Sequence, residues 1–220
     1  MKKINIRNSS EEFIAGKIVC VGRNYEEHAR ELGHNEPDEF PIIFLKPASN
    51  IIFSGEKVVH PSYSNNLHYE TELVLLIGET VKDAKDLDEA EKAIDGYGVG
   101  LDMTLRDIQN AAKDKGDPWT IAKCFDTAAV LSDFILKSEY RLTMNEVIRL
   151  KVNGEIRQNC SLNKMTHTPA QLVKYISSVM TLEKGDLIYT GTPAGVSRVV
   201  KGDKLEAEIS LVAVLETEIT

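Results

Sequence analysis

The sequence predicts a β-rich α+β fold, and three observations support that prediction. Short runs rich in β-branched and aromatic residues, bounded by turn residues, recur along most of the chain, as is typical of strands. Helix signals are confined to three segments. No Pro-, Gly- or Ser-rich linker and no internal repeat divides the 220 residues, so we expect a single domain over 1–220 with a short lead-in over 1–16.

Expected strands run from near the N-terminus to the C-terminus. They cover the segments 17–21, 42–46, 57–60, 69–77, 98–103 and 187–190. A hairpin is expected from 147–152 to 155–159, because the intervening Asn153-Gly154 supplies the two positive φ angles of a type I′ turn. The alternation of apolar and polar residues over 204–219 predicts one or two closing strands.

Three helices are expected, each opening on a residue that favours the N-cap position. They are a short helix over 24–33 opened by Asn24, one from Thr104 to just before Gly116, and one opened by Thr168-Pro169. Asn and Thr side chains accept hydrogen bonds from the first free N–H groups of a helix, and Pro is favoured at the first helical position. Gly33 marks the end of the first helix.

Composition and charge exclude several classes of protein. Hydrophobic residues make up 42% and charged residues 27%, which is typical of a globular domain and disfavours disorder. The net charge of −8 disfavours nucleic acid as a partner. There is no signal-peptide pattern, no apolar run long enough to cross a membrane, and no CxxC pair among the three scattered cysteines. We therefore expect a cytoplasmic protein without a membrane partner.

Three carboxylates are candidate metal ligands. Glu70 and Glu72 share one face of an expected strand, about 6.5 Å apart along the backbone, and the apolar run that follows them favours burial. Asp102 stands among apolar residues at the end of another strand and needs a partner. Oxygen ligands without Cys or His at ligand spacing favour Mg²⁺ or Mn²⁺ over zinc. The same patterns also fit a solvated strand face for the two glutamates and a helix cap for Asp102.

A second candidate group is His28 with Glu31. The i, i+3 spacing places them on one helix face, where the carboxylate can fix the imidazole tautomer and raise its basicity. A general base that activates water needs this arrangement. The charged neighbours fit a plain surface helix as well, and a short polar helix could also be a mobile flap that closes over a substrate.

The third candidate group is cationic and polar. Arg106 and Gln109 lie at i, i+3 on the helix after Asp102, and Lys123 lies in an apolar segment where its charge needs an anionic partner. The loop over 189–196, which contains Thr192, offers backbone N–H groups and hydroxyls that could hold a carboxylate. A plain turn explains this loop equally, and neither phosphate-binding glycine pattern is present.

Taken together, these segments resemble the fumarylacetoacetate hydrolase family, specifically its short single-domain branch of acylpyruvases and oxaloacetate decarboxylases. The matching motifs occur in family order from about residue 17 to the end of the chain. They are VGRNY followed by His28, IFLKP, HYETEL, GLDMT followed by Arg106-Asp107, PW followed by KCFD, and TGTPAGV.

The resemblance implies a fold, a metal site and roles for individual residues. It implies a mixed β-sandwich roll with a few short helices, a homodimer, and Mg²⁺ or Mn²⁺ without an organic cofactor. The implied metal ligands are Glu70, Glu72 and Asp102. His28 and Glu31 correspond to the catalytic pair on a lid over 24–33, joined by Lys123. The implied substrate is a small anionic 2-oxo or enol carboxylate. The residues implied to contact it are Arg106, Gln109 and Thr192.

The resemblance also implies an activity: hydrolysis of a C–C bond in acylpyruvate-type 2-oxo carboxylates. In this hypothesis His28 deprotonates water, the water attacks the distal carbonyl, and cleavage leaves a metal-bound enolate whose charge Lys123 offsets. Family members that isomerise often lack the His–Glu pair, so its presence here favours hydrolysis or decarboxylation. The alternatives are an oxaloacetate decarboxylase or tautomerase, a hydroxydienedioate isomerase or decarboxylase, and a ligand-binding family member without turnover.

Overall fold

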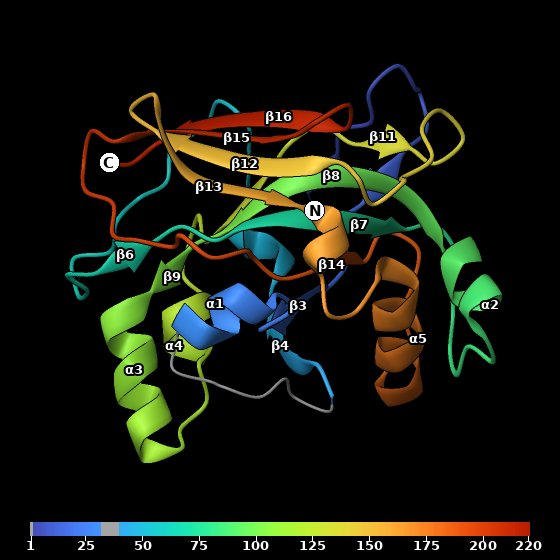
Figure 1. Ribbon diagram of the computed structural model, residues 1–220, viewed down its shortest axis with the longest axis horizontal. Helices are drawn as coiled ribbons and strands as arrows, with labels where there is room; N and C mark the ends of the chain where they lie inside the picture. The colour runs from blue at the N-terminus through green and yellow to red at the C-terminus, as the bar shows by residue number, and fades with distance from the viewer. Residues whose placement is uncertain (1, 32–39) are drawn as a thin grey trace.

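Two β-sheets that pack face to face form the body of the protein, with short helices around them (Figure 1). The computed structural model describes residues 2–31 and 40–220. The larger sheet has the order β4 (Ile42–Lys46), β3 (Ile18–Gly22), β14 (Leu187–Tyr189), β7 (Thr71–Ile77), β8 (Ile94–Asp102), β10 (Ala129–Leu131) and β5 (Ile51–Phe53), with β11 (Ile135–Leu136) also paired to β8. The pairs β14–β3 and β10–β5 are parallel and the others antiparallel, so the predicted mixed, β-rich fold is confirmed.

The smaller sheet covers one face of the larger one. Its order is β13 (Glu155–Ser161), β12 (Val147–Val152), β15 (Lys204–Ile209) and β16 (Ala213–Glu218), all antiparallel. The predicted hairpin is confirmed, with φ of 53° at Asn153 and 83° at Gly154. Two short pairs complete the strands: β1 (Lys3–Ile4) with β2 (Phe13–Ile14), and β6 (Leu67–His68) with β9 (Thr104–Leu105).

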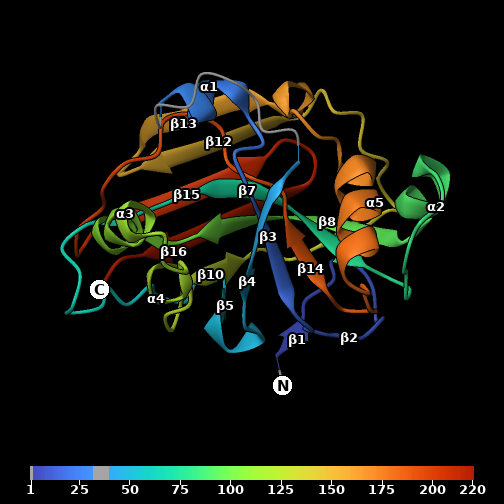
Figure 2. The same cartoon turned by 90° about the horizontal axis from the view of Figure 1, so that it is seen from below.

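Strand β7 lies at the centre of the molecule and is buried along its whole length. Its side chains alternate between two apolar clusters, because successive residues of a strand point to opposite faces. Leu73 and Leu75 join the cluster that fills the space between the two sheets, whereas Val74 joins a second cluster on the other face. The lead-in covers that second face with Ile4 and Phe13, and Figure 2 shows the β1–β2 pair beside β3 and β14.

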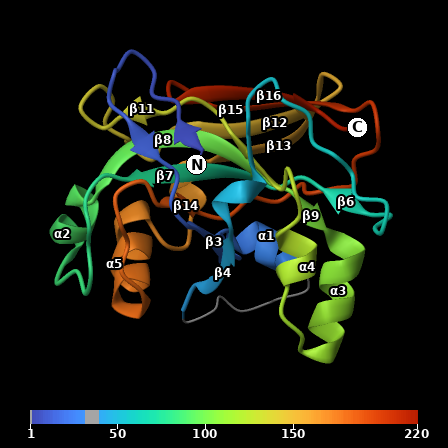
Figure 3. The same cartoon turned by 180° about the vertical axis from the view of Figure 1, so that it is seen from behind.

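Helices lie at both ends of the larger sheet. Their bounds are α1 (Glu26–Glu31), α2 (Leu87–Lys92), α3 (Arg106–Lys115), α4 (Thr120–Lys123) and α5 (Pro169–Val179), with 3₁₀ turns at Ala48–Asn50 and Leu162–Lys164. Helices α3 and α4 pack together at one end, and α2 and α5 pack together at the other (Figure 3). No helix in the described ranges is both long enough and apolar enough to cross a membrane.

Two of the five predicted helix boundaries, the start of α5 and the end of α3, follow local sequence signals. Helix α5 opens with a capping box, in which Thr168 accepts from the Gln171 backbone and Gln171 accepts from that of Thr168. Helix α3 ends at Gly116, whose φ of 73° is left-handed, as predicted. The predicted end of the first helix at Gly33 lies outside the described residues.

Two predicted N-caps were wrong, because tertiary contacts occupy the capping side chains. The Asn24 side chain donates to the carbonyls of His167 (3.0 Å) and Thr190 (2.8 Å) and accepts from the His167 N–H (2.7 Å). Thr104 belongs to β9, and α3 begins after Leu105 without a side-chain cap. The Thr104 hydroxyl instead accepts from the Lys123 ammonium at 2.7 Å.

The predicted strand over 57–60 was also wrong, since only Val58 forms an isolated bridge there, to Ile219. The segment 57–60 forms backbone hydrogen bonds with Glu218 and Thr220 at the end of the chain, but these bonds are too few to make a strand. The sequence prediction missed β5 (Ile51–Phe53), which lies at the edge of the larger sheet, and the short helices α2 and α4.

The three bonds of the buried Asn24 side chain predict a large loss of stability in Asn24→Ala. We expect a loss of about 3 kcal/mol in the free energy of unfolding, because buried partners are left without hydrogen bonds. A simple helix cap such as Thr168→Ala should cost about 1 kcal/mol. Urea unfolding of the two variants measures both values, and equal losses would contradict the bridging role of Asn24.

Candidate active site

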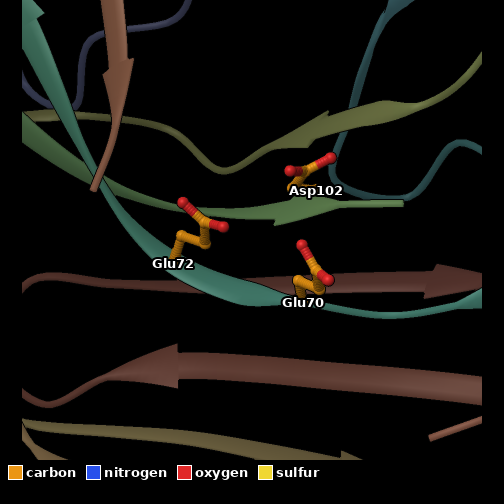
Figure 4. Close-up of side chains that lie close together, drawn as sticks. All are labelled: Glu70, Glu72 and Asp102. Atoms are coloured by element: carbon orange, nitrogen blue, oxygen red, sulfur yellow. The ribbon is translucent and has the colours of Figure 1, made fainter. Parts of the chain in front are cut away.

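Three buried carboxylates, Glu70, Glu72 and Asp102, converge at one end of the β7–β8 pair (Figure 4). One oxygen from each lies within 4.8 Å of the others. Glu70 directly precedes β7, Glu72 lies within it, and Asp102 ends β8. The three residues are 0–6% exposed, so the alternative of a solvated strand face is excluded. Asp102 does not cap α3 either, because the N-cap residue is Leu105.

The antiparallel register of β7 and β8 brings these side chains together. The ladder pairs Glu72 with Gly100, and the Asp102 N–H extends it by donating to the Glu70 carbonyl at 2.9 Å. Because residues two apart share a face, all three carboxylates lie on one side of the sheet. Gly100, opposite Glu72, lets the Tyr189 ring pack against this strand, since a Cβ there would lie 2.6 Å from that ring.

Lys123 occupies the space between two of the carboxylates. Its Nζ lies 2.7 Å from Glu70 Oε2, 2.7 Å from Asp102 Oδ2 and 2.7 Å from Thr104 Oγ1, which uses all three ammonium donors. Burial alone would lower the pKa of Lys123, but Asp102 and Glu70 hold its pKa above the usual range. Lys123 is therefore a permanent cation within the carboxylate group.

Arg106 and Gln109 form the next part of the site, on the first turns of α3. One guanidinium nitrogen of Arg106 bonds to Glu70, and Nη1 donates to Gln109 Oε1 at 2.5 Å. Burial would raise the pKa of Glu70, but Lys123 and Arg106 hold it well below its usual range. Glu70 is therefore ionised and fully paired.

Lys46 is a charged neighbour that the sequence analysis did not include in the site. Its ammonium donates to the carbonyls of Met103 (3.1 Å), Ala128 (2.9 Å) and Lys123, and lies 2.8 Å from Asp102 Oδ1. Since its three N–H groups point to carbonyls, Lys46 supplies charge to Oδ1 but no hydrogen bond. The sequence signal that could have indicated Lys46 as a site residue is its position in the IFLKP motif.

The residues present fit a hard divalent cation. Asp102 Oδ1 is a buried oxygen without a hydrogen-bond donor in the described structure. Burial raises the pKa of Glu72 well above its usual range, and the neighbouring Asp102 and Glu70 raise it further. A cation among the three would relieve this repulsion and could bind the Asp102 oxygen that accepts no hydrogen bond. Carboxylate oxygens without nitrogen or sulfur donors suit Mg²⁺ or Mn²⁺.

His28 and Glu31 meet on α1. His28 Nδ1 lies 3.2 Å from Glu31 Oε2, and the same oxygen accepts from the Gly195 N–H at 3.2 Å. His28 is only 4% exposed, which excludes a plain surface position. Burial lowers the pKa of His28, although Glu70 and Glu31 oppose the shift. A neutral His28 that donates Nδ1–H to Glu31 keeps Nε2 free as a proton acceptor.

A small cavity of about 30 Å³ connects these groups. Seven of the nine site residues expected from sequence line it, namely His28, Glu70, Glu72, Arg106, Gln109, Lys123 and Thr192. Glu31 and Asp102 lie behind this lining as partners of His28 and Lys123. The structure thus brings all nine residues into one neighbourhood.

Further lining residues were missed by the sequence analysis. They include Arg23, Phe44, Lys113 and Trp119. Lys123 Nζ lies 4.8 Å from the centre of the Phe44 ring, and Lys113 Nζ lies 5.3 Å from that of Trp119. Arg23, Phe44 and Trp119 belong to the quoted motifs, whereas nothing in the sequence around Lys113 distinguishes it from other helix-surface lysines.

Comparison with known proteins identifies relatives along most of the chain. The mitochondrial oxaloacetate tautomerase FAHD1 of Bos taurus is 42% identical over 192 residues, which cover 87% of this chain and 86% of that protein. The mitochondrial oxaloacetate decarboxylase of Dictyostelium discoideum is 44% identical over 195 residues, or 88% of each chain.

The fold and the sequence family agree with these relatives. A fumarylpyruvate hydrolase from Pseudomonas aeruginosa, solved in complex with Mn²⁺ and pyruvate, superposes with a TM-score of 0.95 at 36% identity, over 100% of this chain and 95% of that one. Residues 17–220 match the sequence model described as fumarylacetoacetate (FAA) hydrolase C-terminal. The chain therefore belongs to the fumarylacetoacetate hydrolase family.

Proposed function

We propose that the protein is a divalent-metal-dependent enzyme that interconverts the keto and enol forms of oxaloacetate or a similar small 2-oxo dicarboxylate. The observation that carries this proposal is the charge balance of the site. Three buried carboxylates, Glu70, Glu72 and Asp102, face three buried cations, Lys46, Lys123 and Arg106, so this inner group carries no net charge. Arg23 and Lys113 add positive charge at the cavity lining, and a divalent cation would add +2, which favours a dianionic substrate.

The relatives support the same substrate class. One curated relative is named for oxaloacetate tautomerisation and another for oxaloacetate decarboxylation, and both reactions pass through the enol or enolate of that acid. The neighbouring fumarylpyruvate hydrolase structure holds Mn²⁺ and pyruvate, a smaller 2-oxo carboxylate.

Each group of the site has a place in this reaction. Mg²⁺ or Mn²⁺ held by Glu70, Glu72 and Asp102 would supply Lewis-acid stabilisation of negative charge on the 2-oxo oxygen. Neutral His28, oriented by Glu31, removes the proton from the carbon next to the oxo group, and solvent supplies the proton that the oxygen takes up. Arg106, Gln109 and Thr192 hold the substrate carboxylate.

Hydrolysis of acylpyruvates is the second candidate, and two observations favour it. The fumarylpyruvate hydrolase superposes along this whole chain, and the His28–Glu31 pair has the geometry of a base that activates water. In that reaction His28 takes a proton from water, the resulting hydroxide attacks the distal carbonyl, and the C–C bond breaks to release a carboxylic acid and the enolate of pyruvate. Lys123 would offset the enolate charge.

The proposal includes the organisation of the molecule. We expect one catalytic domain over 1–220, because a single apolar cluster joins both sheets. Helix α1 would form part of the lid, since it carries His28 and Glu31 beside the cavity. We also expect a homodimer, as the family resemblance implies, and a cytoplasmic location, as the sequence patterns indicate. Light scattering of the purified protein measures the oligomeric state.

A substrate panel tests the proposed function. With Mg²⁺ present, we expect keto–enol exchange of oxaloacetate, followed by ultraviolet absorbance, to be at least about tenfold faster in kcat/KM than C–C cleavage of acetylpyruvate or fumarylpyruvate. Faster acylpyruvate cleavage would assign the second candidate. Binding of pyruvate without turnover of any compound, hydroxydienedioates included, would make the protein a ligand-binding member.

Substitution of two of the carboxylates should weaken metal binding in both variants but lower the free energy of unfolding in only one of them. We expect both Asp102→Asn and Glu72→Gln to weaken Mn²⁺ binding, measured by calorimetry, at least about 100-fold and to abolish turnover. Asp102→Asn breaks buried ion pairs and should cost about 3 kcal/mol of unfolding free energy, whereas Glu72→Gln removes repulsion and should not destabilise the metal-free protein.

The matched control for these variants is Glu206→Gln, which changes a partly exposed ion pair with Lys151 in the smaller sheet. It should leave Mn²⁺ affinity and turnover unchanged, because surface pairs contribute little. Normal Mn²⁺ affinity in Asp102→Asn would exclude the proposed metal centre.

The lowered pKa of His28 predicts the acid limb of the pH profile. His28 acts as a base only when neutral, so kcat/KM should fall toward tenfold per pH unit below a midpoint that lies under the usual histidine pKa of about 6.5. Glu31→Gln removes a carboxylate that stabilises the imidazolium, so the midpoint should move to lower pH. His28→Gln should lower the rate at least about 100-fold and abolish the limb. An acid midpoint above 6.5 would contradict this role.

A further inference from the structure

Gln158 connects three parts of the candidate active site from the smaller sheet. It lies on β13, is 1% exposed, and extends its amide toward the larger sheet. Its Oε1 accepts from the Thr71 N–H at 3.2 Å, while its Nε2 donates to Thr192 Oγ1 at 2.9 Å and to the Pro193 carbonyl at 2.8 Å. No sequence motif pointed to this residue.

The chemistry of its partners determines which way the Gln158 amide faces. The Thr71 N–H can only donate, so it must meet the amide oxygen. The Pro193 carbonyl can only accept, so it must meet the amide nitrogen. A flipped amide would lose both bonds. The nitrogen therefore also faces Thr192, and Thr192 Oγ1 is the acceptor of that bond.

The Thr192 hydroxyl consequently has its proton left to donate. Thr192 is buried, lines the cavity, and has no acceptor for this proton among the described residues. We propose that Gln158 is a positioning residue that directs the Thr192 hydroxyl proton into the cavity, toward the carboxylate of a bound 2-oxo acid. This inference rests on the proposed function for the identity of the ligand.

The same amide also sets the position of the loop relative to the carboxylates. Thr71 lies between Glu70 and Glu72, so the Gln158 bond to its N–H ties β13 to the metal-binding segment. The loop that carries Thr192 returns to that segment through the Gly191 N–H, which donates to Glu72 Oε2 at 2.7 Å. Gln158 thereby holds the substrate-binding hydroxyl at a constant separation from the candidate ligands.

Pyruvate binding in the presence of saturating Mg²⁺ tests the proposal. Trp119 is the single tryptophan of the chain and lines the cavity, so its fluorescence reports occupancy. We expect Thr192→Val and Gln158→Met each to raise the Kd for pyruvate about tenfold, which corresponds to about 1.4 kcal/mol. The double variant should be no weaker than Thr192→Val alone, because Gln158 acts through Thr192.

Two further measurements separate positioning from a structural role. Mg²⁺ affinity without pyruvate should remain within about threefold of wild type in Gln158→Met, whereas a merely structural loss would weaken it together with pyruvate. Tyr69→Phe is the matched control, because it removes the hydrogen bonds of the Tyr69 hydroxyl with the Gly195 carbonyl (3.0 Å) and the Ser197 hydroxyl (2.6 Å) without touching Thr192. Its Kd for pyruvate should stay within about twofold of wild type.

Gln158→Glu covers the case in which Gln158→Met does not fold. It keeps the side-chain length and the acceptor for Thr71, but its second oxygen accepts the Thr192 proton, so pyruvate binding should again weaken at least tenfold. Additive effects in the double variant, or unchanged pyruvate affinity in both Gln158 variants, would overturn the inference alone. Absence of pyruvate binding by the wild type would overturn the proposed function and this inference together.

Discussion

The rest of the site depends on the buried ion pairs of the Lys123 ammonium with Glu70 and Asp102, each at 2.7 Å. Removing charges from water is so unfavourable that a buried ion must be paired and hydrogen bonded. Lys46 and Arg106 extend the pairing at Asp102 and Glu70, and Glu72 remains without a cationic partner in the described structure. That asymmetry leaves the Glu72 carboxylate, and an Asp102 oxygen that accepts no hydrogen bond in the described structure, available to a metal ion.

The sheet architecture is what keeps these charges in contact. Glu70 and Asp102 are brought together because the β7–β8 ladder continues past the last paired residues, and Lys123 reaches them from the far end of α4. The apolar clusters on both faces of β7 restrict any shift of register, since a slip by one residue would turn the carboxylates into the space between the sheets. Metal binding and core packing therefore share one constraint.

The loop after β14 joins the separate parts of the site. Its backbone N–H groups donate to Glu72 at Gly191 and to Glu31 at Gly195, and Gln158 holds Thr192 between them. A single loop thus contacts the candidate metal ligands, the proposed base pair and the substrate-binding hydroxyl. A change in the loop position would alter all three contacts together.

The sequence by itself determined the features that depend on near neighbours in the chain. Glu70 and Glu72 lie on the same face because a strand has a period of two residues. The Asn153-Gly154 turn and the Thr168 cap follow from local backbone preferences. Only the tertiary structure decided the roles of Lys46 and Gln158, which act through strands far from them in sequence. It also reassigned Asn24 from a predicted cap to a bridge, because its partners His167 and Thr190 lie 143 and 166 residues away. Local propensities describe which nearby backbone groups a side chain can bond to. Strand pairing and burial bring distant polar groups into contact with the same side chain, and its hydrogen bonds then form with those groups.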